Sequence, residues 1–137
     1  MSGSPAVLYV EDDPLSRTIM NILLTKQMGL TQVAIFESSV DFEGQLARLP
    51  FQPDIIFLDI HMKPASGFDL LKVLRGMSDY ARKPIVALTA SVMNEEIDQL
   101  KDAGFNGVIP KPIHQNTFPE SFQKLLNGET VWQISRK

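Results

Sequence analysis

The stretch DIIFLD (residues 54–59) decides the fold that this 137-residue sequence predicts. Its four central residues are large and apolar, which is typical of a strand that other elements cover on both faces. Such a strand lies in the middle of a parallel sheet, and Asp59 then stands at its carboxyl end. The stretch therefore predicts an α/β fold with a carboxylate at the edge of its central strand.

Similar short runs of branched and aromatic residues stand on both sides of this stretch. The five expected strands are Ala6–Val10, Thr31–Phe36, Asp54–Leu58, Ile85–Leu88 and Gly107–Ile109. Segments long enough for a helix separate these strands, and parallel strands need such covering helices as crossovers. The alternation predicts a parallel sheet wrapped on both faces, in a single domain of ordinary size.

Each expected strand is followed by apolar residues at helical spacing. Asp13 is a good N-cap for the first helix, and Pro14 suits its first position. Ser38 or Ser39 is expected to cap the second helix. The residues expected to face the core are Leu15, Ile19, Ile22 and Leu23 in the first helix, Phe42, Leu46 and Leu49 in the second, Leu70, Leu71, Leu74 and Met77 in Gly67–Met77, Met93, Ile97 and Leu100 in Val92–Ala103, and Phe118, Phe122, Leu125 and Leu126 in Thr117–Leu126.

Acidic residues follow two of the expected strands. Open α/β sheets bind ligands outside the carboxyl ends of their strands. Glu11, Asp12 and Asp13 come after the first strand and Asp59 after the third, so carboxylates would crowd one edge of the sheet. Hard oxygen ligands of this kind suit Mg²⁺. Solvated loop acids are the alternative, and for Asp13 a role as helix cap is the better interpretation.

The other two strand ends carry a hydroxyl and a lysine. Thr89 follows the fourth strand, where its hydroxyl would suit a bound phosphoryl oxygen. Lys111 stands between two prolines after the fifth, where its ammonium would pair with phosphate and Asp59. Taken singly, Thr89 is better explained as a strand residue or cap and Lys111 as a surface lysine. The set of four strand ends predicts a phosphate site.

Four motifs resemble the receiver domain of two-component response regulators, the family that includes the bacterial chemotaxis regulator. They are VLYVEDDP (7–14), PDIIFLDIHMKPASG (53–67), PIVALTA (84–90) and GFNGVIPKPI (104–113). The resemblance covers roughly Ala6–Leu126 and implies a doubly wound, flavodoxin-like sheet of order 2-1-3-4-5 with five helices. It assigns residues 1–127 to the receiver domain and residues 128–137 to a C-terminal tail or the start of a linker.

The resemblance also implies a role for each matching position. The matches are Asp59 for the phosphoacceptor, Thr89 and Lys111 for the residues that contact the phosphoryl group, and Glu11, Asp12, Asp59 and the His61 backbone carbonyl for the Mg²⁺ ligands. The implied protein is a signalling switch rather than an enzyme, with intrinsic Mg²⁺-dependent autophosphorylation from small donors and autodephosphorylation. The implied donor is a sensor histidine kinase or a histidine phosphotransfer protein.

The output side departs from the family pattern. The resemblance implies a homodimer or output-domain contact through the fourth helix, fifth strand and fifth helix. Many receivers have an aromatic residue three positions before the lysine, where this chain has Val108. In the tail, Val131, Trp132 and Ile134 would add a strand, contact a partner or begin a linker, and a packed tail or linker is the favoured expectation.

Composition excludes several other classes of protein. Apolar residues make up 44% of the chain and charged residues 21%, which is ordinary globular usage. The formal net charge is -3 and no basic run suggests a nucleic-acid surface. Cysteine is absent, which excludes disulfides and thiolate zinc sites. No apolar stretch is long enough for a bilayer and MSGSP is unlike a signal peptide, so we expect a cytoplasmic protein without membrane contact.

Three other functions share parts of this pattern. A degenerate receiver that binds partners without phosphorylation would lack an essential acid, hydroxyl or lysine, and all are present here. An aspartate-nucleophile phosphatase usually has a second Asp two residues after the nucleophile, where this chain has His61. A flavin-binding domain needs a glycine- or hydroxyl-rich phosphate loop after the first strand, and this sequence has no such loop there. The degenerate receiver stays the main alternative, ahead of the phosphatase.

Overall fold

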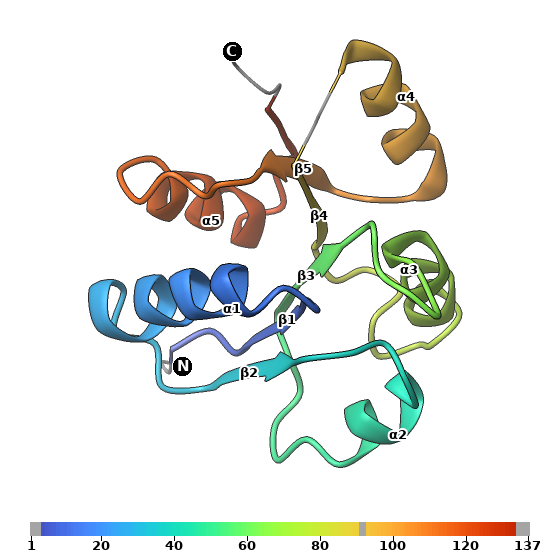
Figure 1. The fold of residues 1–137 in the computed structure, drawn as a ribbon, viewed down its shortest axis with the longest axis horizontal. Coiled ribbons are helices and arrows are strands. Elements are labelled where there is room, and N and C mark those ends of the chain that lie inside the picture. The colour runs from blue at the N-terminus through green and yellow to red at the C-terminus, as the bar shows by residue number, and fades with distance from the viewer. Residues whose placement is uncertain (1–3, 91–92, 134–137) are drawn as a thin grey trace.

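The computed structural model of the chain describes residues 4–90 and 93–133. Within these residues a parallel sheet of order β2-β1-β3-β4-β5-β6 has helices on both faces (Figure 1). The strands are β1 (Val7–Val10), β2 (Val33–Phe36), β3 (Ile55–Asp59), β4 (Ile85–Thr89), β5 (Gly107–Pro110) and β6 (Val131–Trp132). The helices are α1 (Pro14–Asn21) with its π-helical continuation η1 (Ile22–Gln27), α2 (Phe42–Ala47), α3 (Gly67–Arg75), α4 (Asn94–Ala103) and α5 (Phe118–Leu126). The predicted doubly wound fold is confirmed.

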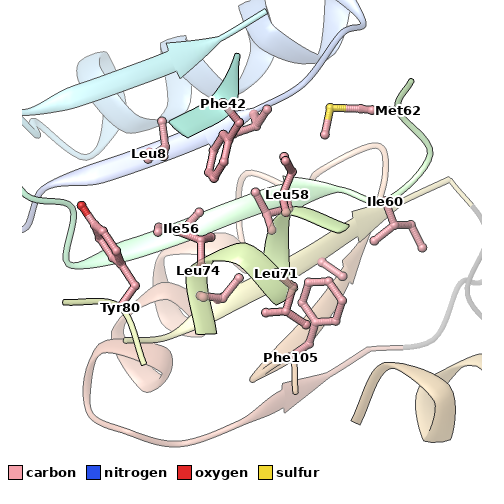
Figure 2. Packing of buried hydrophobic residues seen from close by; sticks show 14 of the residues in the cluster. Leu8, Phe42, Ile56, Leu58, Ile60, Met62, Leu71, Leu74, Tyr80 and Phe105 are labelled. Atoms are coloured by element: carbon pink, nitrogen blue, oxygen red, sulfur yellow. The ribbon is translucent and has the colours of Figure 1, made fainter. Parts of the chain in front are cut away.

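Two clusters of buried side chains hold the layers together, one on each face of the sheet. Ile56 and Leu58 of β3 belong to the cluster under α2, α3 and α4, which Figure 2 shows from close by. Phe57 points to the opposite face, because successive side chains of a strand alternate. There it contacts the rings of Phe118 and Phe122, with centroid distances of 5.5 and 6.3 Å. The stretch around β3 is therefore buried from both sides, as its apolar run predicts.

Local interactions set where the helices beside the carboxyl edge begin. The predicted cap at Asp13 is confirmed, since its side chain accepts a 2.8 Å hydrogen bond from the Ser16 backbone N–H and Pro14 follows at the first position. Ser66 and Asp69 form a reciprocal capping box at the start of α3. Gly67 lets α3 approach the strand, because a Cβ there would lie 2.8 Å from the backbone carbonyl oxygen of Asp59.

The predicted cap of the second helix is wrong. α2 begins at Phe42, after Asp41 in the left-handed conformation with φ 53°, and no side chain caps it. Ser38 instead accepts a hydrogen bond from the Val40 backbone N–H at 3.0 Å and so closes a turn. Ser39 accepts one from the Ala65 backbone N–H at 3.1 Å. Both hydroxyls are thus used in loops near the carboxyl edge rather than at a helix start.

Some residues expected to face the core lie at the surface. Leu15 is 67% exposed and Ile22 is also exposed. Leu23 is buried as expected, and Met20 and Leu24 fill the core beside it. From Ile22 the helix widens into the π-helical η1, so the ordinary helical period no longer sets which of the following residues face the core. One residue of the predicted fourth helix also differs. Met93 is exposed at the cap position before α4, and Val92 lies outside the described residues.

The C-terminal tail adds a sixth strand, one of the three alternatives for these residues. Val131 and Trp132 pair in parallel with Gly107 and Val108 of β5. The side chain of Lys101 on α4 lies over the Trp132 ring, 5.2 Å from its centroid. Ile134, the third tail residue of the expectation, lies outside the described residues. No helix in the described ranges is long and apolar enough to cross a membrane.

Gly107→Ala should detach β6. A Cβ at this position would overlap the backbone carbonyl oxygen of Val131, so the strand must move away. We expect the fluorescence of Trp132, the sole tryptophan, to shift to the red and the free energy of unfolding to fall by about 1–3 kcal/mol. Gly76→Ala is the matched control, because its new Cβ makes ordinary contacts of 3.5 Å or more. An emission spectrum of Gly107→Ala equal to that of the wild type would contradict the pairing.

Candidate functional site

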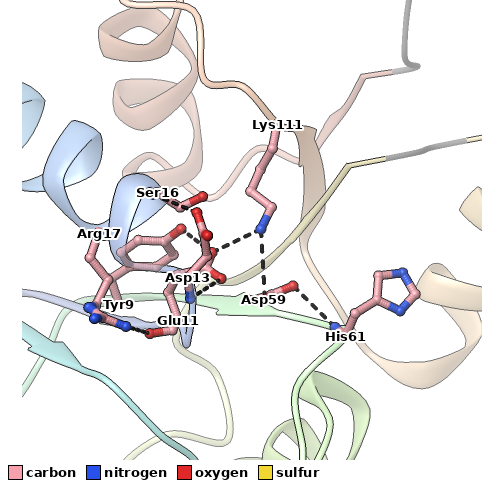
Figure 3. A network of polar contacts seen from close by, with 8 residues as sticks. All are labelled: Tyr9, Glu11, Asp13, Ser16, Arg17, Asp59, His61 and Lys111. Atoms are coloured by element: carbon pink, nitrogen blue, oxygen red, sulfur yellow. Dashed lines mark hydrogen bonds and ion pairs between the residues drawn. The ribbon is translucent and has the colours of Figure 1, made fainter.

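The parallel sheet brings four strand ends to one edge. Asp59 is the last residue of β3 and Thr89 the last of β4. Glu11 follows β1 directly, and Lys111 follows β5. Figure 3 shows Glu11, Asp59 and Lys111 pointing toward one another. This is the arrangement that the strand-end rule predicts for ligands of such sheets.

Three acids form a compact cluster at this edge, the acidic cluster of Glu11, Asp12 and Asp59. One carboxylate oxygen from each lies within 4.8 Å of the others. Glu11 is 0% exposed, Asp59 is also buried and Asp12 is exposed. Burial raises the pKa of Glu11, and the neighbouring carboxylate of Asp59 raises it further. Crowded hard oxygen donors, two of them buried, fit a divalent cation such as Mg²⁺.

Asp13, the last acid of the run that begins at Glu11, is absent from this cluster. Its carboxylate accepts hydrogen bonds from Ser16, first from the backbone N–H, and these lower its pKa. The sequence interpretation of Asp13 as a helix cap is therefore confirmed. The Asp13 backbone N–H contacts the acidic cluster, because it donates a hydrogen bond to Glu11 Oε2 at 3.2 Å.

Lys111 supplies the positive charge of the site. Its Nζ lies 3.1 Å from Glu11 Oε1 and 3.7 Å from Asp59 Oδ2. Only 17% of the side chain is exposed, so water screens these pairs less than it screens a surface pair. The Lys111 backbone N–H donates to the carbonyl oxygen of Thr89 at 2.8 Å, which ties the end of β5 to the end of β4. The lysine thus offsets part of the acidic charge.

His61 and Thr89 complete the set that the sequence singles out. The His61 backbone N–H donates to Asp59 Oδ1 at 3.1 Å, which orients that carboxylate. In Figure 3 the imidazole of His61 extends away from Glu11. Thr89 is buried, and the residue before it, Leu88, is the register partner of Asp59 on the neighbouring strand.

Two contacts of Glu11 were not predicted from the sequence. The hydroxyl of Tyr9 donates to Glu11 Oε1 at 2.5 Å. Arg17 donates from Nη1 to the backbone carbonyl of Glu11 at 3.0 Å. The spacing of Tyr9 and Glu11 carries a signal, since residues two apart on a strand face the same side. Burial and the hydrogen bond to Glu11 raise the pKa of the Tyr9 phenol above its usual range, so it stays a donor.

A small apolar hollow of about 300 Å³ opens beside Lys111. It is lined by Asp13, Leu15, Ser16, Ile19, Ala90, Lys111, Pro112 and Ile113. The exposed Leu15 stands on its α1 side, next to the cap that Asp13 makes. The site is therefore bordered by an apolar surface on the side of α1 and the loop after β5.

Comparisons with known proteins agree on one family. Residues 7–123 match the model of the response regulator receiver domain. Over 137 residues the chain is 35% identical to a nitrate/nitrite response regulator protein homolog from Haemophilus influenzae, with 100% of this chain and 64% of that protein covered. It is 29% identical over 123 residues to chemotaxis protein CheY-3 from Vibrio cholerae, covering 87% of this chain and 89% of that protein.

A solved structure of a chemotaxis protein has the same fold as this chain. Chemotaxis protein CheY4 from Vibrio cholerae superposes with a TM-score of 0.78 at 25% identity, covering 90% of this chain and 99% of that one. The chain spans less than two thirds of the length of the Haemophilus relative but most of the length of the chemotaxis proteins.

Proposed function

The chain belongs to the response regulator receiver domain family, and from this membership we propose that Asp59 accepts a phosphoryl group with the help of Mg²⁺. Receiver domains of response regulators are signalling switches that work with histidine kinases or phosphotransfer proteins. One observation carries the proposal: Lys111 Nζ lies 3.1 Å from Glu11 and 3.7 Å from Asp59, inside the acidic cluster. A cation and a charged phosphoryl group both fit such a set of charges.

The proposed reaction is a phosphoryl transfer to a carboxylate. A carboxylate oxygen of Asp59 forms a bond to phosphorus, the bond from phosphorus to the donor histidine nitrogen breaks, and the donor imidazole keeps the electron pair. Mg²⁺, held by Glu11, Asp12, Asp59 and the His61 backbone carbonyl, would offset the charge on the phosphoryl oxygens. The hydrogen bond from the His61 N–H orients Asp59 before the attack.

Lys111 and Thr89 serve the phosphoryl oxygens in this proposal. The Lys111 ammonium already neutralises part of the acidic charge, so it can follow negative charge from the carboxylates to the phosphoryl group. The hydroxyl of Thr89, at the end of the neighbouring strand, donates to another phosphoryl oxygen. Because the Lys111 backbone N–H is bonded to the Thr89 carbonyl, movement of either loop is passed to the other.

We propose that the donor is a sensor histidine kinase or a histidine phosphotransfer protein in the cytoplasm, and that small phosphate donors also serve. Incubation with acetyl phosphate and Mg²⁺ tests the assignment without knowledge of the partner. One added phosphoryl group per chain, lost slowly by hydrolysis, is the expected mass-spectrometric result. An unmodified chain after prolonged incubation would count against it.

The protein donor is proposed to dock over the apolar hollow beside Lys111. Leu15 is 67% exposed there although it is large and apolar, and the hollow lies next to the site that must receive the phosphoryl group. A donor that covers Leu15 would bury apolar surface and exclude water from Asp59.

Leu15→Asp should therefore slow phosphoryl transfer from a phosphohistidine protein by at least about tenfold, the usual cost of losing one good apolar anchor. The rate from acetyl phosphate should stay near the wild-type value, because the small donor needs no docking surface. Val40→Asp is the control, since Val40 is 57% exposed before α2 and does not line the hollow. Equal slowing by both variants, or none by Leu15→Asp, would argue against docking at this surface.

The output surface is proposed to include the tail. β6 lies on the edge of β5, Trp132 lies under Lys101 of α4, and Gln133 Nε2 donates to Ser121 Oγ of α5 at 2.9 Å. The tail thus touches all three elements of the expected output face. We propose that phosphorylation shifts the loops after β4 and β5 and changes how α4 meets Trp132, which alters homodimer or output-domain contacts at this face.

A further inference from the structure

Tyr9 reaches the acidic cluster from inside the sheet. It lies in β1, it is fully buried, and its side chain belongs to the core cluster under α1 and α5. Residues two apart on a strand face the same side, so the ring of Tyr9 lies on the same side of the sheet as Glu11. The Tyr9 hydroxyl donates a 2.5 Å hydrogen bond to Glu11 Oε1 (Figure 3). A buried phenol therefore touches one of the three acids directly.

Glu11 is fixed by donors from three parts of the chain. Oε1 accepts from the Tyr9 hydroxyl and, at 3.1 Å, from Lys111 Nζ. Oε2 accepts from the Asp13 backbone N–H at 3.2 Å. A carboxylate oxygen has roughly two acceptor sites, so the two donors fill Oε1, whereas the described residues supply Oε2 with one donor. The Tyr9 hydrogen bond thus decides which oxygen of Glu11 keeps capacity for a further partner.

An apolar residue at position 9 would fill the same space without this hydrogen bond. Among the described residues, Lys111 would then remain as the donor to Glu11 Oε1. Because the Glu11 side chain is 0% exposed, water would not replace the lost hydrogen bond. The carboxylate would be free to turn toward the lysine. Packing alone therefore does not account for a tyrosine here, since phenylalanine packs as well.

We propose that Tyr9 is a positioning residue for the cation site: its hydroxyl orients Glu11 so that the acidic cluster is preorganised for Mg²⁺. The proposal rests on the proposed function, in which Glu11 is a Mg²⁺ ligand. Hydrogen bonds that orient a metal ligand commonly change metal affinity by about 10- to 100-fold. Tyr9 lies behind Glu11 and takes no part at the phosphoryl group, so its contribution belongs to metal affinity and not to the rate at saturating Mg²⁺.

The test compares Tyr9→Phe with Tyr80→Phe in the unphosphorylated full chain. These are the two tyrosines of the chain, both are buried, and Tyr80 packs in the opposite core cluster at the far end of α3 (Figure 2). We expect calorimetry to show Mg²⁺ affinity about tenfold weaker for Tyr9→Phe and unchanged for Tyr80→Phe. We also expect the half-saturating Mg²⁺ concentration for phosphorylation by acetyl phosphate to rise in Tyr9→Phe, with the saturated rate near the wild-type value.

A spectroscopic measurement adds a readout that a merely structural role would not move. In protein labelled with ¹³C at the tyrosine ring carbon that bears the oxygen, the Tyr9 signal should shift when Mg²⁺ is added and the Tyr80 signal should not. Equal Mg²⁺ affinity of wild type and Tyr9→Phe, whatever their Tm values, overturns the role of Tyr9 and leaves the proposed function standing. If the wild-type chain binds no Mg²⁺, both the role of Tyr9 and the proposed function are overturned. Asp12→Asn, which removes an acid of the cluster, shows the calorimetric signal of a chain with a weakened Mg²⁺ site.

Discussion

Asp59→Asn will abolish phosphorylation by acetyl phosphate and by any phosphohistidine donor, with no added phosphoryl group by mass spectrometry. The asparagine amide has the shape of the carboxylate and still offers an oxygen to the His61 backbone N–H. In the wild-type chain this N–H donates to Asp59 Oδ1 at 3.1 Å. It is not a nucleophile toward phosphorus, however, so the reaction loses its acceptor. The substitution also removes one of the two buried carboxylates of the acidic cluster, so we expect the metal-free variant to unfold at a temperature equal to or above that of the wild type.

Asp13→Asn provides the matched control for this prediction. It makes the same chemical change in an acid of the same edge, and asparagine caps a helix as well as aspartate does. It should take up phosphate at close to the wild-type rate. Stable phosphate incorporation in Asp59→Asn, under conditions where Asp13→Asn and wild type also react, would falsify the assignment of the acceptor.

Lys111→Met should change phosphorylation and Mg²⁺ binding in opposite directions. The rate of phosphorylation at saturating Mg²⁺ should fall by about two orders of magnitude, the usual loss when a preorganised charge partner of the transition state is removed. Mg²⁺ affinity should rise by roughly tenfold, because a positive charge 3.1 Å from Glu11 and 3.7 Å from Asp59 now competes with the cation. Calorimetry for Mg²⁺ and mass spectrometry for phosphate measure the two effects separately.

Lys63→Met removes the same charge from the loop after Asp59 and serves as the control. Lys63 is exposed, and water and salt screen its charge more strongly than that of Lys111. Both effects should therefore be small in this variant. If Lys111→Met lowers Mg²⁺ affinity, its ammonium supports the cation site instead of competing with it, and the assigned electrostatics are wrong.

The strand-end residues could be predicted because two general rules act together. Short apolar runs predict buried parallel strands, and the carboxyl ends of such strands meet at one edge. Asp59 and Lys111 are 52 positions apart in the chain by their numbers, yet this reasoning alone brings them together, and their side chains lie 3.7 Å apart. Family resemblance supplied the individual roles, which the experiments above test.

Other features depended on interactions that spacing does not encode. Ser38 is a good helix cap by residue type, but the nearby Val40 N–H takes its hydroxyl for a turn. Leu15 fits the apolar stripe of the first helix, but it is 67% exposed beside the hollow next to Lys111, and Met20 of the same helix fills the core. Neither outcome follows from residue type and periodicity alone.

The polar role of the Tyr9 hydroxyl was not predicted from the sequence, and a strand in the tail was one of three alternatives. Tyr9 looks like one more buried strand residue, and only the position of its hydroxyl beside Glu11 reveals a polar role. Trp132 and Val131 form too short a run to predict a strand with assurance, and they pair because Gly107 leaves the edge of β5 open to them. Val108, small at the position where many receivers have an aromatic residue, pairs with Trp132 in this sheet.

Trapping the phosphorylated residue tests the central claim most directly. Borohydride reduces an acyl phosphate to an alcohol, so a phosphorylated aspartate is converted to homoserine at its own position in the chain. After incubation with acetyl phosphate and Mg²⁺, we expect peptide mass spectrometry to find homoserine in place of Asp59, and to find none when Mg²⁺ is removed with a chelator. Homoserine in place of another acid, or a reduced Asp59 independent of Mg²⁺, would contradict the proposed site.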